Sequence, residues 1–102
     1  FNRRLILMAL SESIEYDKIE IVSIYKHVQV RKATVIKKDG EELTRSFERY
    51  FLQCGELDAS DNLVDTNISA EPAEVQAICN AVWTTDVKTA YKNFLIANKK
   101  PS

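Results

Sequence analysis

The chain has few of the residues on which most catalytic and ligand-binding motifs depend. Its 102 residues include 2 glycines, 2 prolines, 2 cysteines and 1 histidine. Two glycines are too few for a loop that cradles phosphate or for a flexible linker. One histidine and two cysteines leave metal and nucleophile chemistry short of ligands and bases. We therefore expect a protein that is not an enzyme and that needs no cofactor and no metal.

The chain also lacks a large net charge and a long apolar run. Lys and Arg number 14 against 15 for Asp and Glu, so no overall field draws the chain to nucleic acid or to an anionic membrane. The apolar run at residues 5–10 is far shorter than the roughly 20 residues of a membrane span. With 45% hydrophobic residues, the chain can bury one modest core. We expect one soluble domain without a membrane partner.

The two ends of the chain are interpreted separately from its centre. Phe1 opens the sequence, whereas Met8 begins a stretch, Met-Ala-Leu-Ser-Glu, that would serve as a natural start. Residues 1–7 are therefore interpreted as an upstream segment, and the apolar run that begins there is too short for a secretory signal. We place a single domain at residues 8–98 and a frayed tail at residues 99–102.

The two cysteines are too few and too far apart for the disulfide framework of a small secreted domain. Cys54 falls at the end of a predicted strand, and Cys79 lies on the apolar face of a predicted helix. We therefore expect two reduced, largely buried thiols in an intracellular protein.

Residues 17–54 have the alternation and the β-branched residues that are typical of strands. Val28 and Val30 alternate with polar residues, and the apolar positions resume at Ala33 and Val35 with the parity shifted by one. Such a slip indicates a β-bulge, which twists and bends a strand. We therefore expect three antiparallel strands in a curved sheet.

The dipeptide Asp-Gly at residues 39–40 is the clearest local signal. It favours the positive φ angles of a two-residue type I′ turn between two strands. The turn would set Lys38 opposite Glu41, an oppositely charged cross-strand pair. Continued without a bulge, the same register places Arg31 opposite Glu48.

The third predicted strand, residues 43–54, is apolar on both faces, with Phe47 and Phe51 on one and Tyr50 and Leu52 on the other. A strand of this kind is usually central or covered. The first predicted strand is short and partly polar, so the sheet has an exposed edge. We expect that edge to be covered or to pair with another copy of the chain.

The second half of the chain passes from a polar, acidic stretch to a helical period. Residues 56–67 are interpreted as a crossing loop. Ser69 is a suitable N-cap for the first helix, and Thr84 or Thr85 for the second. Trp83, between two apolar stripes, is interpreted as a plug of the core or of the helix junction. The stripes are formed by Val75, Ile78, Cys79 and Val82, and by Val87, Ala90, Tyr91, Phe94 and Leu95.

Strands that precede helices along the chain indicate an α+β domain. The predicted fold is a three-stranded antiparallel, curved β-meander followed by two C-terminal helices that pack on one face of the sheet. No internal repeat and no second domain are apparent in the sequence.

His27 and the acidic stretch are the places where catalytic or metal chemistry could gather. His27 is the one side chain suited to general base work near neutral pH, but no catalytic signature surrounds it, so we interpret it as a surface imidazole. Aligned as a calcium loop from Asp58, the acidic stretch has Leu63 where an EF-hand needs Gly and Ser69 where it needs Glu. We therefore name no catalytic and no metal-binding residue, and leave open whether residues 56–67 bind a cation weakly.

Positive charge gathers in the predicted sheet. Residues 26–49 contain seven basic and four acidic residues. Lys32, Arg45 and Arg49, interleaved with phenylalanines, would suit single-stranded nucleic acid. The alternative interpretation is that these charges form salt bridges with the acids of the same hairpin, and we prefer it because such cross-strand pairs are common in sheets.

Three stretches resemble small uncharacterised proteins of marine bacteriophages and ocean metagenomes. They are residues 14–20 (IEYDKIE), 28–40 (VQVRKATVIKKDG) and 74–84 (EVQAICNAVWT), and the similarity extends over residues 8–93. The resemblance implies a phage-like context, in which short proteins are often virion components or infection accessories, and a location in the host cytoplasm or the virion. It implies no activity, cofactor or catalytic residue.

Together these observations favour a non-enzymatic interaction protein that associates with itself or with other proteins, such as a self-associating phage structural or accessory subunit. The alternative is a nucleic-acid-binding accessory protein that uses Lys32, Arg45 and Arg49. Salt distinguishes the two, because binding to nucleic acid weakens steeply as salt is added, whereas apolar assembly persists.

Overall fold

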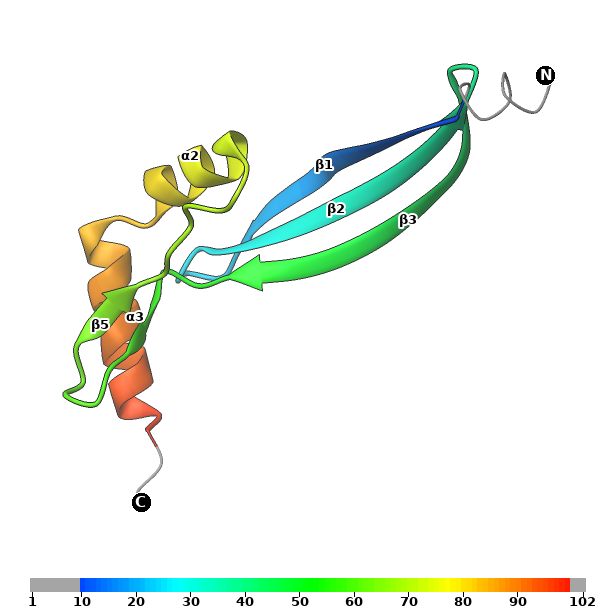
Figure 1. The fold of residues 1–102 in the computed structure, drawn as a ribbon. Coiled ribbons are helices and arrows are strands. Elements are labelled where there is room, and N and C mark those ends of the chain that lie inside the picture. Colours follow the sequence, from blue (N-terminus) through cyan, green and yellow to red (C-terminus); the bar gives the residue numbers. More distant parts are fainter. Residues whose placement is uncertain (1–9, 100–102) are drawn as a thin grey trace. The chain divides into compact units, whose positions relative to one another are not determined.

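The computed structural model describes residues 10–99, which form a three-stranded sheet, a two-stranded hairpin and two helices (Figure 1). The upstream segment at 1–7 and the last residues of the predicted tail lie outside the described residues. No helix in the described range is long and apolar enough to cross a membrane. The elements are β1 (Leu10–Val22), β2 (His27–Lys38), β3 (Glu41–Leu52), β4 (Gly55–Leu57), β5 (Leu63–Asp65), α2 (Ala73–Val82) and α3 (Thr85–Ala97).

The three long strands form a meander in the order β1-β2-β3, and the two helices follow them along the chain. Consecutive strands are antiparallel and joined by short turns. The predicted α+β class, with three antiparallel strands followed by two C-terminal helices, is confirmed. Two short turns in succession make the second strand the middle one, so the prediction that the third strand is central or covered was wrong.

The burial of side chains agrees with this strand order. Val28, Val30, Ala33 and Val35 of β2 are all at most 1% exposed, and they show the predicted change of parity between Val30 and Ala33. On the outer strand β3, by contrast, Phe47 remains 45% exposed. The apolar residues of β3 therefore do not indicate a covered strand.

Strand β1 is longer than the sequence indicated. It spans 13 residues and begins at Leu10, where a short first strand was expected. Its sequence lacks clean alternation, and both Leu10 and Ile14 are more than 40% exposed. Pairing with β2, together with side-chain contacts of Glu15 and Asp17, takes the place of an apolar pattern.

The predicted turn between β2 and β3 is confirmed. Asp39 and Gly40 are the two residues between the strands, and their φ angles are 53° and 83°. Positive φ at both central positions defines the type I′ turn, whose twist matches that of the flanking strands. The first turn, between β1 and β2, also has positive φ at Ser23 and Lys26.

The described chain forms two compact units, residues 10–19 with 30–50 and residues 20–29 with 51–99. The first unit consists of the three strands around the Asp39 turn. The second contains the other ends of these strands, the β4–β5 hairpin and both helices. Its buried residues are Val28, Cys54, Gly55, Val75, Cys79, Trp83 and Tyr91.

The first helix begins later than predicted. Pro72, and not Ser69, is the N-cap of α2, and no side chain caps the helix. The helical conformation is disfavoured for a residue that precedes proline, so Glu71 does not extend the helix back toward Ser69. The first helical residue is Ala73. The Ser69 amide instead donates to the side-chain oxygen of Asn67 at 3.0 Å, in a turn that precedes the helix.

The junction between the helices agrees with the sequence. The Thr84 hydroxyl accepts from the Val87 amide at 3.2 Å and caps α3. Trp83 is 8% exposed, and its indole Nε1 donates to the Lys26 carbonyl at 2.7 Å. Trp83 therefore fills the junction, as predicted, and also ties it to the turn between β1 and β2.

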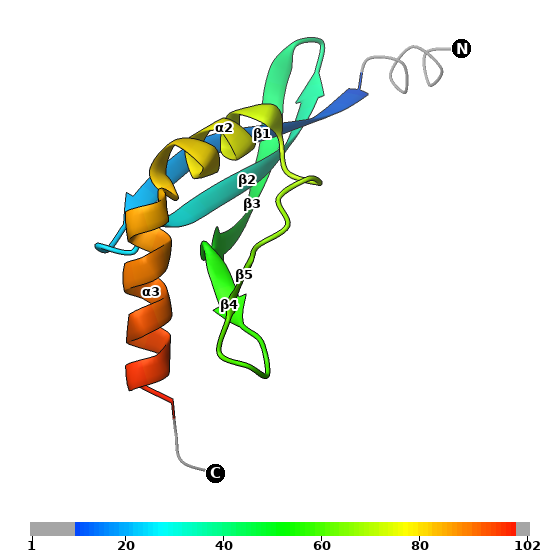
Figure 2. The same ribbon diagram turned by 90° about the vertical axis from the view of Figure 1, so that its left-hand side faces the viewer.

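The acidic stretch is not a plain crossing loop, because it contains the β4–β5 hairpin, in which Glu56 is opposite Val64. The strands are three residues long, too short for a period to be visible in the sequence. The hairpin lies beside α3 (Figure 2), and ion pairs of 3.2 Å from Lys88 to Asp65 and 2.8 Å from Lys99 to Asp61 join the two. Lys99 is the first residue of the segment predicted as a tail, and its ammonium group contacts Asp61.

We predict that Gly40→Ala destabilises the fold by about 1–2 kcal/mol, because a Cβ at a φ of 83° is strained although the surrounding space is open. Asp39→Asn is the matched control, since asparagine also favours this turn, and should change the free energy of unfolding by less than about 0.5 kcal/mol. Urea unfolding measures both. Equal stabilities for Gly40→Ala and the wild type would contradict the assigned turn.

Candidate interaction surface on the three-stranded sheet

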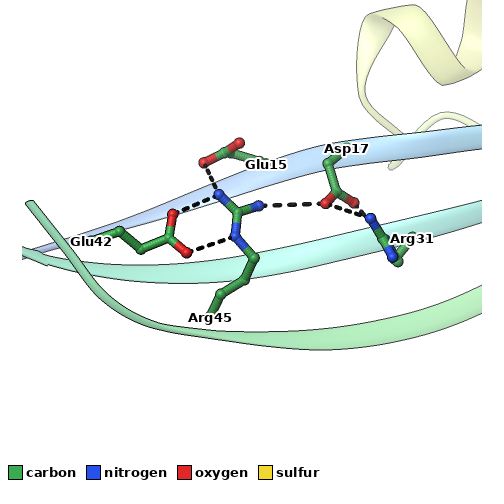
Figure 3. A network of polar contacts seen from close by, with 5 residues as sticks. All are labelled: Glu15, Asp17, Arg31, Glu42 and Arg45. Carbon is green, nitrogen blue, oxygen red and sulfur yellow. Dashed lines mark hydrogen bonds and ion pairs between the residues drawn. The ribbon is translucent and has the colours of Figure 1, made fainter.

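A network of five charged side chains connects all three strands of the first unit (Figure 3). At its centre the Arg45 guanidinium of β3 lies 3.3 Å from Glu15 and 3.4 Å from Asp17, both on β1. Arg45 also donates two hydrogen bonds of 2.8 and 3.0 Å to Glu42. Arg31 of β2 donates two more, of 2.9 and 3.0 Å, to Asp17.

The network changes the ionisation of its carboxylates. The hydrogen bonds from Arg31 are the main reason that the pKa of Asp17 lies below its usual 3.8. Those from Arg45 similarly lower the pKa of Glu42 from its usual 4.5. The same contacts raise the pKa of Arg45. Both carboxylates are therefore charged throughout the neutral range, as their bonds to the arginines require.

Cross-strand salt bridges form in the sheet, but Arg31 and Arg45 bind partners that the sequence did not indicate. Arg31 pairs with Asp17 of β1 and not with Glu48 of β3, the partner predicted from an unbroken register. Strand β2 lies between β1 and β3, so a side chain on β2 has neighbours on both strands, and Arg31 binds the neighbour on β1. The signal for these partners is the pair of acids Glu15 and Asp17. They are two positions apart on one strand, so both side chains lie on the same face of the sheet.

The three residues of the predicted nucleic-acid surface do not form one cluster of available cations. Arg45 is surrounded by three carboxylates. The guanidinium carbon of Arg49 lies 5.9 Å from the centre of the Phe47 ring, against 4.4 Å for that of Arg31. Lys32 lies on β2. Of the three, Arg45 therefore has its charge balanced within the sheet.

Exposed apolar side chains accompany these charges on the outer strands. Leu43 and Phe47 of β3 are 58% and 45% exposed, and Leu10 and Ile14 of β1 are 42% and 46% exposed. Within residues 10–99, β1 and β3 each have a neighbouring strand on one side only. The sheet therefore offers two long edges that carry apolar side chains.

His27, in the second unit, is not the surface imidazole that was predicted. Its ring lies among those of Tyr25, Phe51 and Tyr91, at centroid distances of 6.4, 6.3 and 5.4 Å. Burial lowers the pKa of His27 below its usual 6.5. No local pattern in the sequence indicates this environment, because the four rings come from a turn, two strands and a helix.

In the acidic stretch, the carboxylate of Asp58 binds the backbone of the stretch itself. Asp58 Oδ1 accepts from the amides of Ser60 and Asn62 at 2.8 and 2.9 Å, and these bonds lower the pKa of Asp58. Asp61 is occupied by Lys99. Among residues 10–99, no three histidine, cysteine or acidic side chains lie close enough together to hold a metal ion.

Both cysteines are free and buried, as expected. Burial raises the pKa of the Cys54 thiol, and it raises that of Cys79 to about 11. Only the thiolate is a good nucleophile, so this environment suppresses the reactivity of both residues.

Comparison of the chain with protein-family models, with curated proteins and with solved structures finds no match.

We predict that neither cysteine reacts appreciably with Ellman's reagent at pH 8 in the native protein, since only roughly one part in a thousand of Cys79 is thiolate there. Both thiols should react quickly in guanidinium chloride. Rapid release of chromophore from the native protein would show that the thiols are accessible and contradict their burial.

We predict that Arg45→Gln lowers the urea midpoint, and that the difference from wild type shrinks at about 0.5 M salt because ion pairs are screened. Arg49→Gln is the control, since Arg49 lies outside the carboxylate network. The pKa values of Asp17 and Glu42 are depressed in the fold, so their stabilisation is present above about pH 4.5 and is lost as the pH falls below it. This acid loss should be smaller in Arg45→Gln. An Arg49 variant as unstable as the Arg45 variant would contradict the assignment.

Proposed function

We propose that the chain is a non-enzymatic interaction protein that associates with a second copy of itself through the edge of β3. The supporting observation is a 12-residue outer strand that carries the exposed side chains of Leu43 and Phe47. An outer strand offers backbone groups on which a further strand can pair, and long edges with apolar side chains favour such pairing.

The order of charges along β3 also suits a second copy. The strand begins with the exposed Glu41 and carries Arg49 near its other end. When two copies of β3 pair antiparallel about a two-fold axis, the acidic start of each strand comes near Arg49 of the other, and each contact is made twice. Leu43 and Phe47 of each copy are then brought beside side chains of the other copy's β3.

Self-association is better supported than the nucleic-acid alternative. Arg45 would have to give up its bonds to three carboxylates before it could bind a phosphate. Lys32 and Arg49 alone provide little of the positive groove that a nucleic-acid backbone needs.

A non-enzymatic role is supported by the environment of the groups most suited to catalysis. Burial raises the pKa of both thiols, which opposes thiolate formation. The imidazole of His27 lies among aromatic rings. In the phage-like context that the sequence resemblance implies, the proposed role is that of a structural or accessory subunit.

Light scattering on protein eluting from a size-exclusion column, at low and at high salt, tests the proposal. We expect the wild type to form a defined oligomer that persists at high salt, because apolar contacts and strand pairing are not screened. Leu43→Lys should lower the mass by placing charge on the β3 edge. Ile24→Lys is the matched control, since Ile24 is 74% exposed but lies in the turn between β1 and β2.

A wild-type monomer at all concentrations would overturn self-association. Titration with labelled single-stranded DNA tests the alternative in the same preparations. Binding that falls steeply with salt and is lost in the combined Lys32→Gln and Arg49→Gln variant would favour nucleic acid as the partner.

A further inference from the structure

We propose that His27 is a pH-sensitive latch, which holds α3 against the start of β2 while its ring is neutral and releases the helix when the ring becomes protonated. The ring packs against Tyr91 of α3, edge to face, at a centroid distance of 5.4 Å and an angle of 80°. Within α3, whose residues are all described, Tyr91 is the one buried residue. His27 thus contacts the principal anchor of the helix.

One nitrogen of the ring makes protonation costly in this position. Nδ1 of His27 is buried and has no hydrogen-bond partner among residues 10–99. In a neutral imidazole, Nδ1 can be the nitrogen without a hydrogen, and an unused acceptor is tolerated there. In the imidazolium both nitrogens carry hydrogen, so Nδ1 would become a buried donor with neither water nor an acceptor.

The surroundings offer no charge to compensate. From the turn between β1 and β2 the phenol of Tyr25 faces the ring, from β3 the phenyl ring of Phe51, and from α3 the phenol of Tyr91. None of these three groups is a carboxylate that could pair with an imidazolium. Burial, the same cause that lowers the pKa of His27, raises the pKa of Tyr91. The site therefore favours the neutral ring.

The consequences of protonation reach beyond one contact. Tyr25 packs against Tyr91 and Phe94 of α3 at 5.4 and 4.9 Å, so the histidine and this tyrosine hold the same face of the helix. Lys26 lies between Tyr25 and His27, and its backbone carbonyl accepts the indole hydrogen bond of Trp83 at the helix junction. Movement of the His27 ring toward water on protonation therefore disturbs the packing of Tyr25 and His27 against α3.

The direction of the pH effect follows from linkage. The pKa of His27 is below 6.5 when the latch is closed and returns to about 6.5 when it opens. Below pH 6.5 the open form binds more protons, so its population rises as the pH falls. Asp17 and Glu42 lose their stabilising charge only below about pH 4.5 and belong to the other unit, so the two effects occupy separate ranges.

Because the chain has 1 histidine, an NMR titration of the imidazole reports on His27 without ambiguity. We expect a pKa below 6.5 in the full-length protein. Hydrogen exchange of α3 amides, corrected for the intrinsic effect of pH, should increase between pH 7.5 and pH 5.5 by up to about tenfold. His27→Phe retains a ring that cannot titrate, and its α3 amides should show no such increase.

His27→Gln serves as a second non-titrating variant if the phenylalanine variant does not fold, and the wild-type titration stands without either. A His27 pKa at or above 6.5 would show that attraction between the imidazolium and the rings outweighs the buried Nδ1, and would overturn the latch. So would a low pKa with unchanged α3 exchange, or an equal pH response in a non-titrating variant.

Discussion

The bonds that Asp17 accepts from Arg31 and Arg45 are the contacts that link all three strands of the sheet. Arg31 comes from β2 and Arg45 from β3, so one carboxylate of β1 binds side chains of both other strands. Single exposed ion pairs contribute little to stability, but a shared network with bidentate geometry fixes the positions of several side chains at once. This matters for β3, whose apolar residues remain largely exposed.

The same network decides what the sheet surface can bind. Because Arg31 and Arg45 are already paired with carboxylates, these two positive charges are not free to bind phosphate. What remains on β3 is an edge with exposed Leu43 and Phe47. A surface of this kind favours a partner that supplies backbone hydrogen bonds and apolar contact over one that supplies phosphates.

In the second unit, contacts between aromatic rings join residues that are far apart in the chain, as contacts between charged side chains do in the first unit. The turn between β1 and β2 is tied to α3 through Tyr25 and to the helix junction through Lys26, whose carbonyl binds Trp83. His27 follows directly and contacts Tyr91. Tyr25, Lys26 and His27 thus connect this part of the chain to α3 and to the junction that precedes it, which makes the protonation of a single ring relevant to both.

The sequence by itself determined the elements whose signals are local. Asp39-Gly40 defines the turn because few other residue pairs adopt positive φ twice, and the period of the helices and the cap at Thr84 depend on near neighbours. Tertiary structure decided the rest. The position of β3 at the edge, the pairing of Arg31 with Asp17 and the rings around His27 join residues far apart in the chain. No spacing along a single sequence specifies which distant residues meet, because strand order and a one-residue change of register determine it in space.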